Sequence, residues 1–100
     1  MFLERQIQQI RPGKWAELEA LDQKFNTVES RLGFPTKRRF RCYIGGHHNN
    51  TLIIEREWES LAAMEATYMK IFADPEWQTL SGEFDTISES TQMELYLALS

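Results

Sequence analysis

The central stretch from Thr36 to Trp58, TKRRFRCYIGGHHNNTLIIEREW, constrains the fold more than any other part of the sequence. Both of its ends are rich in aromatic and β-branched side chains, which favour strands. Between them, residues 45–50 supply the glycines and asparagines that are typical of a turn. We therefore predict two antiparallel strands joined by a Gly/His/Asn loop.

The side-chain pattern of this hairpin indicates a register. Unlike charges that face each other across two strands stabilise a sheet. A slip of one residue would instead put Phe40 opposite Glu55 and split the apolar side chains between the faces. The preferred pairs are Ile44–Leu52, Cys42–Ile54 and Phe40–Arg56 on one face, and Tyr43–Ile53, Arg41–Glu55 and Arg39–Glu57 on the other.

The residues before the hairpin predict one strand and one helix. Residues 2–11 place Leu3 and Ile7 on one face of a strand. Pro12 suits the first position of a helix, and Gly33 suits its end. The predicted helix has one apolar stripe, formed by Trp15, Leu18, Leu21, Phe25, Val28 and Leu32.

The residues after the hairpin predict more helix and a final strand. Ser60 can cap a second helix. Asp74-Pro75-Glu76 predicts a short third helix or a bent continuation of the second. Residues 88–90 predict a break, and residues 91–99 alternate strictly, as a strand does.

This order of elements favours one fold class, the ferredoxin-like βαββαβ arrangement of the α+β class. It has a four-stranded antiparallel sheet with both main helices on one face. We expect a single domain over residues 1–100. The helix-covered face should collect Leu3, Ile7, Phe40, Cys42, Ile44, Leu52, Ile54 and the set from Met93 to Leu99. The open face should collect Glu4, Gln6, Gln8, Arg39, Arg41, Tyr43, Ile53, Glu55, Glu57, Glu94 and Tyr96.

Composition narrows the partners and the compartment. The net charge of −4 argues against nucleic acid and anionic membranes, and no apolar run is long enough to span a bilayer. The basic run from Lys37 to Arg41 suggests an RNA surface, but cross-strand pairing with acids explains it as well, so we expect no nucleic acid. Cys42 is the only cysteine, and the start MFLERQ lacks a signal-peptide pattern. We therefore expect a cytoplasmic protein.

Several short segments resemble the NIPSNAP-like proteins of the dimeric α/β-barrel group and, more distantly, antibiotic-biosynthesis-monooxygenase-like domains. They are Glu4-Arg5 leading into Arg11-Pro12-Gly13-Lys14, Thr51 to Trp58 followed by Glu59-Ser60-Leu61, and Ala73-Asp74-Pro75-Glu76-Trp77-Gln78. The resemblance spans nearly the whole chain. It implies a homodimer whose sheets pack with their open faces together, and a pocket between sheet and helices or inside the barrel.

The open face holds the candidate ligand-binding residues Arg41, Tyr43, Glu55 and Tyr96. If a dimer buries this face, its charges must be paired or must meet a ligand. Glu55 could then act as a base with a raised pKa. The alternative interpretation is a network of paired charges in the interface.

The loop histidines His47 and His48 suggest a base, a haem ligand or a metal ligand. Adjacent residues rarely converge on one ion, and no further ligands stand at suitable spacing, so we expect a polar turn and no metal. Trp15, Trp58, Tyr68, Trp77 and Phe84 either line an apolar cavity under the helices or belong to a plain core.

These observations favour a protein that needs no cofactor and either binds a small apolar or aromatic molecule or serves as an interaction module. No phosphate loop, dinucleotide fingerprint or catalytic triad is present. The resemblance implies an alternative function, that of a cofactor-independent monooxygenase or isomerase that acts on a small aromatic or polyketide-like compound. There, His47 or Glu55 would remove a proton and Arg41 would steady the resulting anion.

Overall fold

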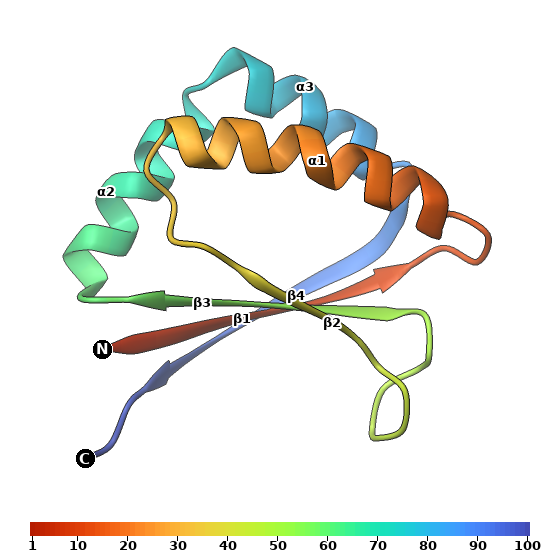
Figure 1. The fold of residues 1–100 in the computed structure, drawn as a ribbon, viewed down its shortest axis with the longest axis horizontal. Helices are drawn as coiled ribbons and strands as arrows, with labels where there is room; N and C mark the ends of the chain where they lie inside the picture. The colour runs from red at the N-terminus through yellow and green to blue at the C-terminus, as the bar shows by residue number, and fades with distance from the viewer.

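Three helices lie on one side of a four-stranded antiparallel sheet in a computed structural model that describes residues 1–100 (Figure 1). The sheet order is β2-β3-β1-β4. The strands are β1 (Phe2–Ile10), β2 (Arg38–Arg41), β3 (Thr51–Trp58) and β4 (Ser88–Leu97), and the helices are α1 (Trp15–Arg31), α2 (Leu61–Phe72) and α3 (Pro75–Phe84). This confirms the ferredoxin-like α+β fold that the order of elements predicts.

The first helix ends as predicted but begins later. Gly13 has a φ of +79°, a backbone conformation that favours glycine, and it turns the chain so that α1 starts at Trp15 and not at Pro12. At the other end, Gly33 has a φ of +85° just after the last turn. The stripe of α1 then packs on the sheet, with Leu18, Leu21 and Val28 buried.

The caps separate α2 from α3. The Ser60 hydroxyl accepts a hydrogen bond from the backbone N–H of Ala63 at 3.1 Å. The Asp74 carboxylate accepts one from the N–H of Trp77 at 3.0 Å, and Pro75 occupies the first turn. Asp74 therefore begins a separate third helix, which confirms one of the two alternatives that the sequence left open.

The apolar core lies between these helices and the centre of the sheet. Its buried members are Ile10, Leu18, Leu21, Val28, Leu52, Ile54, Leu80 and Ile87. Trp15, Phe25, Leu32, Trp77 and Phe84 are partly buried and pack against it.

The two faces of β1 are the reverse of the prediction. Glu4 and Gln8 are buried beneath the helices, and the Gln6 side chain bonds to Tyr68 of α2. Leu3 and Ile7 therefore lie on the open face. Alternation alone places apolar residues toward the core, but here Trp58 of β3 and Tyr68 of α2 form hydrogen bonds with Glu4 and Gln6 on the polar side of the strand.

The hairpin register is also different from the prediction. Arg39 lies opposite Ile54 and Arg41 opposite Leu52, so the pairing is shifted by three residues. An odd shift moves every side chain of β2 to the other face. Arg39 and Arg41 therefore lie on the helix side, and Phe40, beside Ile53, lies on the open face. β2 ends at Arg41. The next three residues, Cys42, Tyr43 and Ile44, therefore belong to the loop and not to the core face.

The final strand starts earlier than predicted. Residues 88–90, expected to form a break, already pair with β1, with an irregular register between Gln9 and Ile10. Beyond this point the faces of β4 agree with the prediction, since Met93 lies beside Gln6 and Glu94 beside Arg5.

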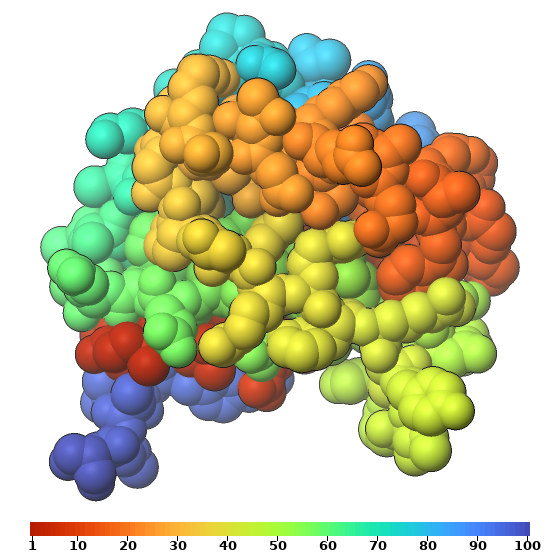
Figure 2. Space-filling view, viewed as in Figure 1, coloured from red at the N-terminus to blue at the C-terminus, as the bar shows by residue number.

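The open face of the sheet is hollowed between two projections. Figure 2 shows the loop between β2 and β3 at one side and the C-terminal residues at the other, both extending away from the helices. No helix combines the length and the apolar character needed to cross a membrane.

Candidate functional site

A cavity of about 350 Å³ lies between the helix-covered face of the sheet and the three helices. One side of it, which we term the aromatic wall, consists of Phe25, Phe34, Tyr68, Trp77 and Phe84. Edge-to-face contacts between Phe25 and Phe84 and between Phe34 and Tyr68 hold four of these rings, and Trp77 packs against Phe72. The wall confirms Tyr68, Trp77 and Phe84 as cavity residues. Trp58 instead turns to Glu4, and Trp15 stacks beneath Arg41.

The floor of the cavity is polar because β1 directs a row of amides toward the helices. Gln8 donates from Nε2 to Gln6 Oε1 at 2.9 Å, and Gln6 donates from Nε2 to Glu4 Oε2 at 2.7 Å. Glu4, only 1% exposed, also accepts from Trp58 Nε1 at 2.8 Å and from the Tyr68 hydroxyl. These partners come from three elements, so the carboxylate is held rigidly behind the cavity.

Tyr68 joins this row to the aromatic wall. Burial, and then the neighbouring Glu4 carboxylate, raise the pKa of the Tyr68 hydroxyl well above its usual range. The phenol therefore stays protonated at neutral pH and donates to Glu4, while it accepts from Gln6 at 3.2 Å.

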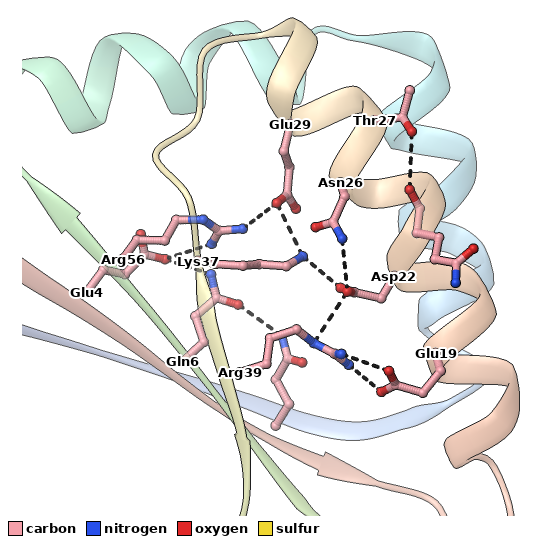
Figure 3. A network of polar contacts seen from close by, with 12 residues as sticks. Glu4, Gln6, Glu19, Asp22, Asn26, Thr27, Glu29, Lys37, Arg39 and Arg56 are labelled. Carbon is pink, nitrogen blue, oxygen red and sulfur yellow. Dashed lines mark hydrogen bonds and ion pairs between the residues drawn. The ribbon is translucent and has the colours of Figure 1, made fainter.

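A chain of ion pairs closes the cavity on the side of α1 (Figure 3). Arg56, with its side chain 4% exposed, donates from a terminal nitrogen to Glu29 Oε1 at 2.7 Å and lies 3.8 Å from Glu4 Oε2. Lys37 lies 2.7 Å from Asp22 and 3.3 Å from Glu29. Each buried cation is thus shared between two carboxylates, as burial of charge requires.

Arg39 extends the chain toward the surface. It donates to both carboxylate oxygens of Glu19, at 2.9 and 2.7 Å. These hydrogen bonds hold the pKa of the Glu19 carboxyl below its usual range. Lys37 and Arg39 of the basic run are therefore paired with α1 and not with the acids of β3.

Three buried polar atoms of this region have no hydrogen-bond partner, namely Gln8 Oε1, Arg39 Nε and Arg56 Nε. Unsatisfied buried groups are rare in folded proteins, because each costs about 1–3 kcal/mol. Gln8 and Arg56 both line the cavity, so a bound molecule could supply the missing partners.

The residues singled out from the sequence do not come together in one place. Glu55 lies on the open face, where it accepts from Arg5 at 3.0 Å and from Arg38 at 3.1 Å. Tyr96 lies on the same face and stacks with Arg5. The predicted pair of Arg41 with Glu55 is wrong, because the register places Arg38 opposite Glu55.

Arg41 and the loop residues lie elsewhere. Arg41 stacks on Trp15 and donates to the Asn49 carbonyl and the Asn50 side chain. Tyr43 and His47 are exposed in the loop, outside the cavity. Glu55 and Tyr96 remain neighbours through Arg5, so a role for the open face stays a prediction. No three His, Cys, Asp or Glu residues are grouped so as to hold a metal ion.

Sequence reasoning missed Glu4, Gln8, Asp22, Glu29 and Arg56 as site residues. Asp22 and Glu29 did carry a signal, because both lie one residue along from Leu21 and Val28 in the apolar stripe of α1. Acids at such flanking positions point partly toward the core and call for buried cations. Their partners Lys37 and Arg56 lie outside the helix and could not be identified from the stripe.

The fold and the cavity together define a class, the ferredoxin-like α+β proteins with a ligand-sized space under their helices. Solved structures of NIPSNAP family proteins have this fold. One from Agrobacterium tumefaciens aligns with a TM-score of 0.83 and 23% identity over 98% of this chain and 85% of that one. A NIPSNAP-like domain protein from Burkholderia xenovorans gives a TM-score of 0.84 and 20% identity, over 99% and 85%.

The fold is also similar, more distantly, to that of an oxygenase. SnoaB, a cofactor-independent oxygenase from Streptomyces nogalater, aligns with a TM-score of 0.72 and 16% identity, over 99% of this chain and 93% of that one. No protein-family model and no curated protein matches the sequence. At these identities the likenesses establish the fold, and the chemistry has to be argued from the residues.

Proposed function

We propose that the protein binds a small, partly apolar molecule in the cavity between the sheet and the helices. The observation that carries this proposal is the combination, in one cavity of about 350 Å³, of an aromatic wall with unpartnered polar atoms of Gln8 and Arg56. Ligand sites are typically spaces of about 300–1,000 Å³ with mainly apolar walls and a few fixed polar groups.

Calorimetric titration with the neutral aromatic alcohol 2-naphthalenemethanol tests this function. The wild type should bind it, and Ser81→Trp should abolish binding, because Ser81 lines the cavity and the indole would fill it. Thr79→Trp, at an exposed position of the same helix, is the matched control and should bind as the wild type does. Equal binding by the wild type and Ser81→Trp would refute the proposal, as would failure of the wild type to bind either the alcohol or its charged naphthyl analogues.

A second candidate function is cofactor-independent oxygenation or isomerisation. The Tyr68–Glu4 hydrogen bond favours it, because Tyr68 lines the cavity and Glu4 could take up the phenol proton as Tyr68 receives one from a bound molecule. The likeness to SnoaB supplies independent support. An oxygen electrode would then register oxygen uptake with a polyketide-like anthrone, and Tyr68→Phe should lose it; no uptake above the uncatalysed rate refutes this activity.

We also propose that the protein is a cytoplasmic homodimer in which the open faces pack together. Phe40 is 50% exposed on this face, in one cross-strand row with Ile53 and the largely buried Ile7, and Leu3 lies further along β1 on the same face. Apolar groups gathered in a hollowed face gain free energy when a matching surface covers them. The lone Cys42, with no disulfide partner, suits a reducing compartment.

A further inference from the structure

The charges around the cavity limit the kind of molecule that it accepts. Four acidic side chains line it, Asp22, Glu29, Asp85 and Glu89, against only Lys37 and Arg56 as bases. Both bases are already engaged, since Lys37 lies within 3.3 Å of two carboxylates and Arg56 bonds to Glu29. Arg56 keeps one unpartnered donor, Nε, but its charge is balanced by Glu29 and Glu4. The net excess of acids around the cavity therefore repels an organic anion.

The opening of the cavity is the most acidic part. Of the residues that line the cavity, only Asp85, Glu89, Ser90 and Thr91 are exposed, and they are close in sequence at the junction of α3 and β4. We term these four residues the acidic mouth. Asp85 has no cationic partner, and the one partner of Glu89, Arg11, lies 3.8 Å away. The mouth therefore combines carboxylates with hydroxyl acceptors.

An independent observation points to a donor on the ligand. Gln8, only 6% exposed, lines the cavity directly beside Thr91, its partner across the β1–β4 ladder. Its Nε2 is directed along the strand to Gln6, so Oε1 is left as a buried acceptor without a partner. A ligand that donates a hydrogen bond near the mouth would satisfy it.

We propose that the cavity receives a flat aromatic amine, with its ring against the aromatic wall and its ammonium group at the acidic mouth. This ligand class rests on the proposed binding function. The ammonium group offers three N–H donors and a positive charge, which suit the carboxylates of the mouth and Gln8 Oε1.

Three isosteric probes test the ligand class by calorimetric titration at pH 7: 2-naphthylmethylamine, which is positively charged, neutral 2-naphthalenemethanol, and anionic 2-naphthoate. The amine should bind about fivefold tighter than the alcohol, the upper range for an exposed ion pair, and the carboxylate weakest. Added salt should reduce the preference for the amine. Equal or tighter binding of the alcohol or the carboxylate overturns the amine class and leaves cavity binding intact. No binding by any probe overturns cavity binding itself.

Charge variants locate the preference at the mouth. In Asp85→Asn/Glu89→Gln the amine should bind no tighter than the alcohol, while the alcohol affinity stays constant. Glu65→Gln/Glu83→Gln removes two acids outside the cavity lining and is the matched control, which should keep the preference. A preference that survives in the mouth variant, or is lost equally in the control, overturns the assignment of the ammonium group to the mouth.

Gln8→Leu tests the buried acceptor. The variant should bind both the amine and the alcohol about three- to tenfold more weakly, because each loses a hydrogen-bond acceptor, and it should leave 2-naphthoate unchanged. Thermal unfolding checks that the variant is folded. Unchanged affinity for the amine in folded Gln8→Leu overturns the role of Gln8.

Discussion

Glu29 is shared by two buried cations in the chain of ion pairs beside the cavity. It accepts from Arg56 at 2.7 Å and lies 3.3 Å from Lys37, and both cations are almost fully buried. In Glu29→Gln these cations lose the carboxylate that they share. Because Arg56 keeps Glu4 and Lys37 keeps Asp22, we expect the free energy of unfolding in urea to fall by about 1–3 kcal/mol, the cost of leaving a buried donor without its partner.

Glu17→Gln on the same helix is the control for Glu29→Gln. Glu17 pairs with Lys14 at 3.1 Å on the surface, so its loss should change the free energy of unfolding by less than about 0.5 kcal/mol. Equal effects of the two substitutions would contradict the view that burial makes the Glu29 pairs important.

The raised pKa of Tyr68 makes the free energy of unfolding depend on pH in the alkaline range. Its pKa is higher in the folded chain than in the unfolded one, so the unfolded chain loses this proton first as the pH rises. The contribution of the protonated Tyr68 hydroxyl to stability is fully present below the ordinary tyrosine pKa of about 10. Above that pH, the free energy of unfolding falls by up to about 1.4 kcal/mol per pH unit. Urea unfolding between pH 9 and 11 should show this slope, and Tyr68→Phe should reduce it.

At the scale of a single element, substitutions of Ser60 test how much its N-cap stabilises α2. Its hydroxyl accepts from the Ala63 N–H, one of the donors that a helix start leaves unpaired. Ser60→Ala should lower the free energy of unfolding by about 1 kcal/mol, and Ser60→Asn should retain most of it. Chemical denaturation measures both variants, and an unchanged Ser60→Ala would mean that water replaces the cap without cost.

The elements themselves could be predicted because their signals are local. The stripe from Trp15 to Leu32, the cap at Ser60 and the Asp74-Pro75 start all determine structure within a few residues. The sheet register could not be predicted in the same way. In β2, Arg39 lies on the helix side, where it pairs with Glu19 and Asp22 of α1. These tertiary contacts cannot be inferred from the pairing of charges across two strands.

The site was hidden for a related reason. Glu4 looks like a surface residue in an alternating strand, and its burial depends on Trp58 and Tyr68, which are 54 and 64 residues away. A single sequence contains these residues but no sign that they meet. The aromatic wall was easier to predict from the sequence. Its members Tyr68, Trp77 and Phe84 belong to apolar helix stripes that must face the sheet.

At the scale of the whole molecule, the reversed faces of β1 and β2 strengthen the proposal of a dimer. With Glu4 and Arg39 under the helices, the open face receives Leu3, Ile7 and Phe40 instead. Its charged side chains are largely paired, Arg5 and Arg38 both with Glu55. An apolar surface with satisfied charges is easier to desolvate than the charged face that the sequence predicts.

Phe40→Glu tests this interface by sedimentation velocity. Because the new carboxylate would lose its hydration in the dimer without gaining a partner, the dissociation constant should rise by about tenfold or more. Met69→Glu introduces the same charge at an exposed apolar position of α2, on the opposite side of the molecule, and should leave the dimer intact. A wild type that sediments as a monomer at every concentration contradicts the dimer. A dimer that Met69→Glu weakens and Phe40→Glu does not would place the contact on the helices instead of the open face.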